Sequence, residues 1–274
     1  MKYTMVLTLA LCMCLLVTTN VGAQDEDVPV TFLVYMDADD GGEYEEVEEE
    51  IWRPVHAQRV RDGKIIGWYL YQVVNAMDGH SDFNYMIVEV YPNWKATEAP
   101  YANVGKLFEE VHGNASIDDF MERTENSRDL VRQDRWLWQM GTNNPEFTMS
   151  DVKYVVVDWM DIHPGQWSDY LDMEREYYMP VHQKRVDAGN ILGWGLWTKM
   201  GYSELPGSID AATSANYSSY EALWNSYPED AWESVHSDLR ESQIYKRMRE
   251  TRMMTGSSIL RLVDYVDATN ASQD

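Results

Sequence analysis

Residues 44–70 read YEEVEEEIWRPVHAQRVRDGKIIGWYL, and residues 170–196 read YLDMEREYYMPVHQKRVDAGNILGWGL. The two segments align without a gap at an offset of 126 residues, and 13 of their 27 positions are identical. Their shared core is P-V-H-x-x-R-V-x-x-G-x-I-x-G-W. An internal repeat has to be identified before any fold is assigned, because it fixes the number of structural units. A domain-sized offset indicates a tandem duplication, and a chain of 274 residues has room for two domains.

The first 23 residues have the pattern of a secretory signal peptide. Lys2 precedes an apolar run from Met5 to Val17, and the small residues Val21-Gly22-Ala23 form a cleavage site. This pattern predicts export to the periplasm or to the extracellular space. Both cysteines, Cys12 and Cys14, lie inside the apolar run. The mature chain is therefore expected to lack disulfides, thiolate catalysis and zinc–cysteine sites.

The charge balance of the mature chain is strongly acidic. Without the signal segment, 21 basic residues stand against 46 acidic ones, which gives a net charge of −25. Such a surface repels nucleic acid and anionic membranes, so neither is expected as a partner. No segment after the signal is long and apolar enough to predict a membrane span. The acidity could recruit cations or basic partners, but solubility and salt tolerance of an exported protein explain it more simply.

Both halves carry the same order of predicted elements. In the first half we expect strands at 30–36, 65–74, 83–91 and 135–140, and helices at 44–61, 101–112 and 117–132. In the second half we expect strands at 154–160, 191–200, 211–217 and 258–265, and helices at 165–187 and 220–252, the latter interrupted at Pro228. Each half thus reads β-α-β-β-α-β, the order of a ferredoxin-like domain. Pro54 and Pro180 fall inside the first helix of each half and should remove a backbone hydrogen bond and bend it.

The predicted fold class is α+β, with two tandem ferredoxin-like domains that form an intramolecular pseudo-dimeric α/β barrel. Each domain would place helices on one face of an antiparallel sheet, and the second copy of the sheet is the obvious cover for the other face. The two sheets could meet as a sandwich or as a barrel. The expected boundaries are a signal peptide at 1–23, domain 1 at 28–140, a linker at 141–151, domain 2 at 152–267 and a tail at 268–274. Such an internal pseudo-dimer can stand as a monomer.

The kinked helix with V-H-x-x-R-V, followed by G-x-I-x-G-W at the second strand, resembles the dimeric α/β-barrel superfamily. That group includes antibiotic-biosynthesis-monooxygenase-like, EthD-like, YCII-like and NIPSNAP-like domains. The resemblance covers residues 30–140 and 152–266, and it implies a ligand pocket between the helices and the sheet of each half. Members range from haem-degrading and cofactor-free oxygenases to proteins with no assigned activity. The sequence requires no cofactor, and haem is the one that the resemblance allows.

One face of the duplicated helix carries the candidate site residues. Glu48, Trp52, His56 and Arg59 occur at i, i+4, i+8 and i+11 and therefore share a face. The second copy has Glu174, Tyr178, His182 and Arg185 at the same positions. The tryptophans that open the second strand of each half, Trp68 and Trp194, could line the pocket or belong to the core. We take all ten residues as candidates for ligand binding, with His56, Arg59, His182 and Arg185 as the catalytic candidates.

These residue types allow several chemistries. Histidine can act as acid, base or axial ligand, and arginine can bind a carboxylate. Glu48 and His56 lie about 12 Å apart along a helix, too far to share one ion, so no metal site is predicted. The same face could instead have a structural role, with salt bridges that hold the helix against the sheet or the other domain. The identities could also remain simply because the two copies have diverged slowly since the duplication.

The sequence lacks the motifs of hydrolases, nucleotide-binding proteins and EF-hands, so these functions have no support. Three other functions remain open. The first is an exported soluble protein that binds a small aromatic or apolar molecule between the duplicated helix and the sheet. The second is a cofactor-free or haem-dependent oxygenase or isomerase that uses His56 or His182. The third is a structural or interaction module of the cell envelope. An enzyme should bury a histidine in an open pocket, a binder needs an apolar cavity, and an interaction module should show filled cavities and an exposed apolar patch.

Overall fold

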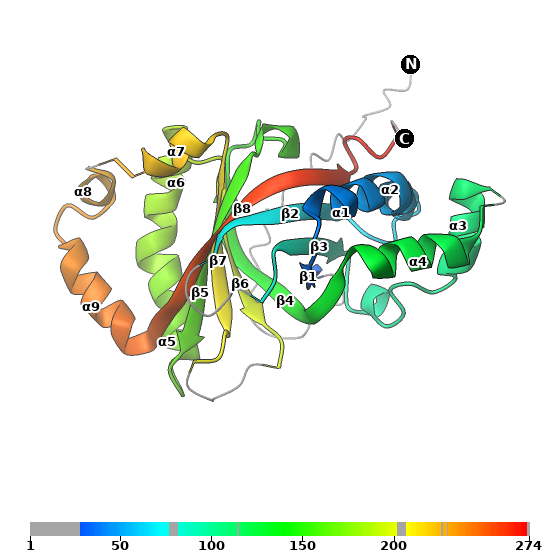
Figure 1. The fold of residues 1–274 in the computed structure, drawn as a ribbon. Coiled ribbons are helices and arrows are strands. Elements are labelled where there is room, and N and C mark those ends of the chain that lie inside the picture. Colours follow the sequence, from blue (N-terminus) through cyan, green and yellow to red (C-terminus); the bar gives the residue numbers. More distant parts are fainter. Residues whose placement is uncertain are drawn as a thin grey trace, which may run out of the picture.

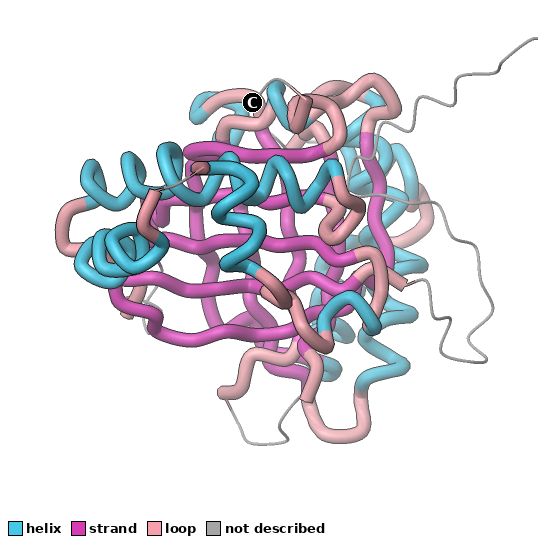
Figure 2. The backbone as a smooth tube through the Cα atoms, turned by 90° about the vertical axis from the view of Figure 1, so that its right-hand side faces the viewer, coloured by secondary structure: helices cyan, strands magenta, loops and turns pink. Residues whose placement is uncertain are grey.

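The computed structural model describes residues 28–76, 82–113, 115–201, 207–225, 227–228 and 230–272. The predicted signal peptide at 1–23 lies outside these ranges. In the described part of the chain, eight strands form one closed antiparallel barrel, and the helices of the two halves lie on opposite sides of it (Figure 1). Figure 2 shows the helices of one side lying in front of the strands that they cover.

The strand order shows how the two halves form the barrel. The strands are β1 (Val30–Asp37), β2 (Gly67–Ala76), β3 (Tyr85–Tyr91), β4 (Asp129–Asn143), β5 (Tyr154–Ile162), β6 (Gly193–Lys199), β7 (Ala211–Tyr217) and β8 (Arg252–Asp267). Their order around the barrel is β1-β3-β2-β8-β5-β7-β6-β4. Each half contributes a ferredoxin-like sheet, and the sheets join where β2 pairs with β8 and β4 pairs with β6. The predicted fold class is confirmed, and of the two arrangements left open the barrel is the right one.

Helices cover the outer face of each half-sheet. The first half has α1 (Gly41–Val47), α2 (Arg53–Arg61), α3 (Val104–His112) and α4 (Ile117–Ser127). The second half has α5 (Trp167–Met173), α6 (Met179–Asp187), α7 (Tyr220–Trp224), α8 (Ala231–Val235) and α9 (Glu241–Thr251). Short 3₁₀ turns occur at Lys95–Thr97 and Met149–Asp151. No helix in the described ranges combines the length and the apolar content needed to cross a bilayer.

The duplicated helix contains a π-helical turn in each half, at Glu48–Trp52 and at Glu174–Tyr178. Pro54 and Pro180 lie in the first turn of the α-helix that follows. A proline has no N–H for the usual i→i−4 bond. In both halves the N–H of the residue before the proline bonds to the first carbonyl of the π turn. The local distortion predicted at both prolines therefore takes the form of a π turn.

A histidine from the outer helices contacts each π turn. His112 Nε2 lies 3.0 Å from the carbonyl oxygen of Ile51, and His236 Nε2 lies 2.9 Å from the carbonyl oxygen of Tyr177. Because a carbonyl only accepts, Nε2 is the donor in both pairs. The two π turns are thus fixed by the same contact, which was retained in both copies of the domain.

Boundaries differ from the sequence prediction in both halves. In the second half, the helix predicted at 220–252 is divided into α7, α8 and α9, and β8 begins at Arg252 instead of residue 258. In the first half, two differences concern β4. Residues 128–132 were predicted as helix, but α4 ends at Ser127, and β4 begins at Asp129 and pairs with β1. Strand pairing overrides the helical pattern there, since strand propensity depends strongly on context. Residues 141–143 of the predicted linker continue β4. Phe147 and Met149 then turn into the barrel and are buried in its interior cluster.

Candidate functional site

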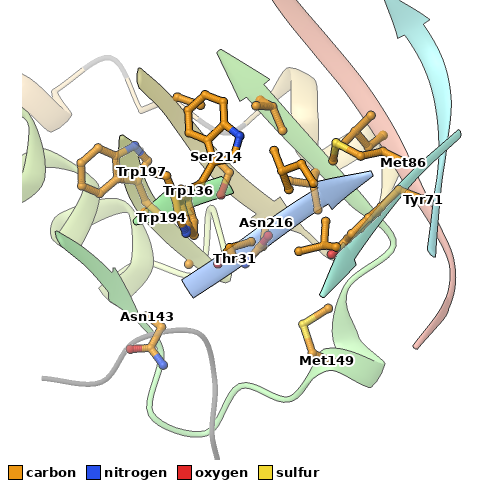
Figure 3. Close-up of a pocket in the computed structure, with 18 of the residues that line it drawn as sticks. Thr31, Tyr71, Met86, Trp136, Asn143, Met149, Trp194, Trp197, Ser214 and Asn216 are labelled. Atoms are coloured by element: carbon orange, nitrogen blue, oxygen red, sulfur yellow. The ribbon is translucent and has the colours of Figure 1, made fainter. Parts of the chain in front are cut away.

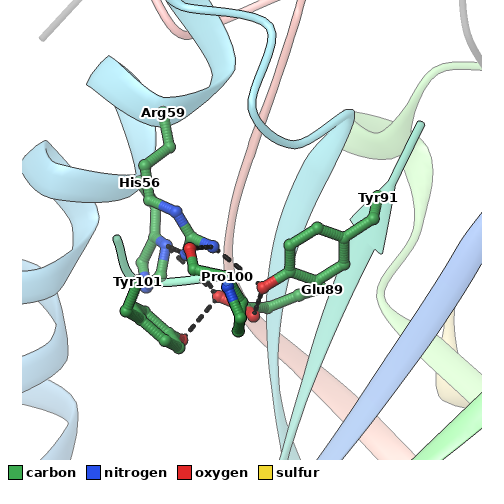
Figure 4. Close-up of polar contacts among 6 residues, drawn as sticks. All are labelled: His56, Arg59, Glu89, Tyr91, Pro100 and Tyr101. Atoms are coloured by element: carbon green, nitrogen blue, oxygen red, sulfur yellow. Dashed lines mark hydrogen bonds and ion pairs between the residues drawn. The ribbon is translucent and has the colours of Figure 1, made fainter. Parts of the chain in front are cut away.

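A buried ion pair connects the duplicated helix to the sheet of the first half. Arg59 on α2 is 3% exposed, Glu89 on β3 is 0% exposed, and Arg59 Nη1 lies 2.5 Å from Glu89 Oε1. The hydroxyls of Tyr91 and Tyr101 donate to the same carboxylate at 2.5 and 2.8 Å (Figure 4). Arg59 also donates to the Tyr91 hydroxyl at 2.9 Å and to the Pro100 carbonyl at 3.2 Å. With three donors, the buried carboxylate is well compensated.

His56 belongs to the same network and lies flat on a tryptophan. Its Nδ1 accepts from Arg59 Nη1 at 2.9 Å, and its ring stacks on Trp68 with centroids 4.9 Å apart and planes at 12°. Burial, reinforced by the neighbouring guanidinium, lowers the pKa of His56 well below its usual 6.5. The ring is therefore neutral at pH 7 with its proton on Nε2. Trp52 lies 6.1 Å from His56, between ring centroids, and its indole N–H donates to Thr124 at 3.0 Å.

Glu48 lies in a separate buried cluster on the same helix. It is 2% exposed, and burial raises its pKa to about 7 against the lowering effects of the Arg128 guanidinium and the Tyr44 hydroxyl. The equivalent residues of the second half are Glu174, Arg252 and Tyr170. Burial raises the pKa of that glutamate to about 7 as well. Both halves thus hold a buried glutamate, its pKa raised to about 7, near an arginine: Arg128, just before β4, and Arg252, the first residue of β8.

The second half repeats the helix side of the network. His182 Nδ1 accepts from Arg185 Nη1 at 2.8 Å, and the ring stacks on Trp194 with centroids 4.5 Å apart and planes at 12°. Burial together with Arg185 lowers the pKa of His182 well below 6.5. Tyr178, which stands where the first half has Trp52, packs edge-on to Trp232.

The sheet side of the network differs between the halves. Ala215 stands 126 residues after Glu89, so the strand position that carries a carboxylate in the first half carries a methyl group in the second. Arg185 lies 3.4 Å from the Tyr217 hydroxyl, and its guanidinium carbon is 5.2 Å from the ring centroid of Tyr227. The helix residues were retained in both copies, but the strand partner was not.

Neither histidine fits a haem iron in this arrangement. An axial ligand needs an accessible ring nitrogen beside space for a porphyrin. Each Nδ1 accepts from an arginine, so the neutral ring carries its proton on Nε2, which then has no lone pair for iron. One face of each ring is covered by tryptophan, and neither ring lines the cavity described below. In the described part of the chain, no three His, Cys, Asp or Glu side chains come together in a way that could hold a metal ion.

The barrel encloses a cavity on the opposite face of the sheet. It offers about 90 Å³ to the centre of a water molecule, several times the roughly 10–15 Å³ that one buried water needs. Its walls are mainly apolar and aromatic, with Leu33, Trp136, Val157, Trp159, Trp197 and Leu260 among them. Figure 3 shows labelled tryptophans gathered on one side of the cavity and Tyr71 and Met86 on the other. None of the described lining residues is Asp, Glu, His, Lys or Arg.

One difference between β2 and β6 accounts for the open space. On β6, Gly193, Gly195 and Trp197 alternate along the barrel-facing side, and a Cβ added to Gly195 would lie 2.5 Å from the Trp197 ring. On β2 the corresponding residues begin with Gly67 and Tyr69, and the Tyr69 side chain folds over Gly67. On β2 the Tyr69 side chain therefore covers Gly67, whereas its counterpart on β6, Gly195, has no side chain to cover Gly193; the space over Gly195 itself is taken by Trp197.

The structure places the ten sequence candidates mainly on the helix side of the sheet. It brings His56 and Arg59 together with Trp68 and Trp52, and only Trp194 also lines the barrel cavity. Sequence reasoning missed Glu89 and Tyr101. Tyr101 could have been found in the sequence, because the second half has a tyrosine, Tyr227, at the equivalent position 126 residues later. A binding role for the ten candidates stays a prediction.

Comparison with known proteins identifies relatives by structure alone. Neither a family model nor a curated protein matches the chain. A candidate monooxygenase of Fusobacterium nucleatum aligns with a TM-score of 0.55 at 11% identity, over 88% of this chain and 95% of that one. An anthrone oxidase-like protein aligns with a TM-score of 0.52 at 12% identity, over 89% and 94% of the two chains. A candidate monooxygenase of Lactobacillus acidophilus gives 0.52 and 12%, over 88% and 96%.

At these identities the matches establish the fold and nothing more. They agree with the closed barrel of eight strands and with the duplication of one ferredoxin-like unit. The resemblance to the dimeric α/β-barrel superfamily is thereby confirmed at the level of fold.

Proposed function

We propose that the protein binds a small, mainly apolar molecule inside the barrel. The cavity is the observation that supports this. Protein interiors are close-packed, and few voids in them exceed the size of a water molecule. A larger space with aromatic walls and a few neutral polar groups has the character of a ligand site. The open cavity also favours a binder over an envelope interaction module, whose interior would be filled.

This site differs from the pocket between helix and sheet that the sequence resemblance implied. In the first half, the ion pair of Arg59 and Glu89 occupies the space under α2, and its partners are hydrogen-bonded to one another. A ligand there would have to displace a compensated buried charge, which is costly. We assign this network the role of holding the duplicated helix on the sheet.

Equilibrium dialysis with naphthalene tests the proposal. Ser214 lines the cavity opposite Gly195, so Ser214→Leu should fill the space and abolish binding. Ser218 is exposed just after the same strand, and Ser218→Leu is the matched control that should bind as the wild type does. Binding that survives Ser214→Leu, or no binding to the wild type, would refute a barrel site.

The structural relatives favour a second candidate, an oxygenase that acts on the molecule held in the barrel. Because none of the described lining residues is Asp, Glu, His, Lys or Arg, such a reaction would depend on a substrate with acidic hydrogens of its own. Anthrone is a suitable probe: its methylene carbon would take one atom of O₂ as a carbonyl, and the other would leave as water with the two hydrogens. The measurement is oxygen uptake by anthrone in excess of the rate without protein. Loss of this excess in Ser214→Leu would support the candidate, and an excess that the substitution leaves unchanged would contradict it.

Export is the remaining part of the proposal, and the signal pattern at residues 1–23 supports it. The mature protein should begin at Gln24 in the periplasm or the medium. N-terminal sequencing of the protein from its native cells tests this, and an intact Met1 on the mature protein would contradict it.

A further inference from the structure

We infer that the barrel ligand is an uncharged, flat aromatic molecule with a hydrogen-bonding oxygen at one end, and that Asn143 and Asn216 bind that oxygen. The inference rests on the proposed function, since it concerns the same cavity and names the class of its ligand.

The two asparagines lie on either side of one glycine. Asn143 on β4 and Asn216 on β7 both pair with Gly193 on β6. A Cβ added to Gly193 would lie 3.4 Å from the Cβ of Asn143 and 3.5 Å from Nδ2 of Asn216. All three residues line the cavity. The missing side chain of Gly193 therefore leaves a gap bordered by the Cβ of Asn143 and the amide nitrogen of Asn216 at one end of the barrel.

Both amides are available to a ligand. Among the described residues, neither the Asn143 nor the Asn216 side chain makes a hydrogen bond, and both residues are partly buried. Each amide offers a donor and an acceptor, so each can bond to a hydroxyl or a carbonyl oxygen in the cavity. Because both residues are only partly buried, water can pair with their amides when no ligand is bound, and a ligand oxygen would take the place of that water.

The walls beyond the amides suit a flat ring. Trp136 and Trp159 meet with centroids 6.0 Å apart at 58°, and Trp197 lies over Gly195. Aromatic rings gain from offset and edge-to-face contacts with such a surface. A charged group would lose its hydration without meeting an opposite charge, because no ionisable Asp, Glu, His, Lys or Arg lies among the described lining residues.

Among the described residues, the first half has no counterpart of the two asparagines. Val90, which stands 126 residues before Asn216, is buried in the interior cluster of the first half. Asp267 pairs with Gly67 as Asn143 pairs with Gly193, and its carboxylate accepts from the backbone N–H of Thr269 at 2.8 Å. The pseudo-twofold barrel thus has one polar end of this kind, and one ligand per chain is expected.

Equilibrium dialysis of three probes tests the inference on the full-length mature protein. The probes are naphthalene, 2-naphthol and 2-naphthoate, which share one ring system. We expect 2-naphthol to bind more tightly than naphthalene, and 2-naphthoate to bind at least tenfold more weakly than 2-naphthol. Asn143→Ala and Asn216→Ala should each weaken the binding of 2-naphthol roughly two- to tenfold, which corresponds to the loss of one hydrogen bond. The same substitutions should change the affinity for naphthalene less than twofold. Asn75→Ala, an exposed asparagine on β2, is the control and should change neither.

The outcomes separate this inference from the proposed function. If naphthalene binds and the two asparagine variants leave 2-naphthol unchanged, the inference is wrong while the barrel site stands. Equal weakening of naphthalene and 2-naphthol by both variants would also overturn it, as would 2-naphthoate binding as tightly as 2-naphthol. If no probe binds the wild type, the proposed function itself is refuted. Naphthalene binding by each variant shows in the same experiment that its barrel is folded.

Discussion

Replacing Glu89 with alanine should destabilise the fold more than any surface change of charge. Glu89 is fully buried and accepts hydrogen bonds from Arg59, Tyr91 and Tyr101. The substitution would leave the guanidinium of Arg59, which is 3% exposed, without its carboxylate. It would also remove the acceptor of two tyrosine hydroxyls.

The size of the effect follows from the burial of the pair. Removing one partner of a buried ion pair costs about 3–5 kcal/mol, because the other charge stays desolvated. For a domain of this size, about 1 kcal/mol corresponds to roughly 2–4 °C in Tm, so a loss of about 6–20 °C is expected. Glu89→Gln keeps an oxygen that can accept hydrogen bonds, so it should lower the Tm less than Glu89→Ala does.

Urea unfolding followed by circular dichroism measures this difference. Glu46→Ala is the matched control, since Glu46 is exposed on α1, and it should change the free energy of unfolding by less than about 0.5 kcal/mol. A loss below about 1 kcal/mol for Glu89→Ala would show that the ion pair does not hold the helix on the sheet. The second half, with Ala215 at this position, shows that the fold can be built without this carboxylate when other residues have changed with it.

Two further predictions concern a buried acid and a glycine. The folded pKa of Glu48 is raised to about 7 from 4.5, so its contribution to stability is present at low pH and is lost as the pH rises through 7. Glu48→Gln should therefore exceed the wild type in unfolding free energy by about 3 kcal/mol at pH 8 and match it at pH 4; an equal difference at both pH values would contradict the raised pKa. Gly195→Ala would place a Cβ 2.5 Å from the Trp197 ring and should cost about 1–3 kcal/mol and alter the near-ultraviolet circular dichroism of the tryptophans. Gly105→Ala, whose Cβ would meet nothing closer than 3.9 Å, is its control, and equal spectra of the two variants would count against the proposed position of Trp197.

The barrel could be predicted because the sequence repeats its own domain. A half-sheet with helices on one face needs a cover for the other, and the second copy is always present. The pairings that close the barrel, β2 with β8 and β4 with β6, join residues far apart in the chain and leave no local signal. For the same reason the start of β4 was predicted as helix, since its partner lies about a hundred residues earlier.

The candidate site could be predicted only in the region where the two copies of the domain retain identical residues. The shared His-x-x-Arg spacing and the glycine-tryptophan pair led to the contact among His56, Arg59 and Trp68. Glu89 left no such trace, because the second copy has alanine there and the rest of its strand is apolar. The cavity was harder still to predict. It depends on a side chain that is absent at Gly195, and a void becomes visible only when both faces of every strand are placed.

A crystal structure of the mature protein with 2-naphthol would show directly whether the ligand lies inside the barrel. We expect one ligand per chain, with its rings against Trp159 and Trp197 and its hydroxyl at Asn143 and Asn216. A ligand bound between helix and sheet against His182, with an empty barrel, would contradict it.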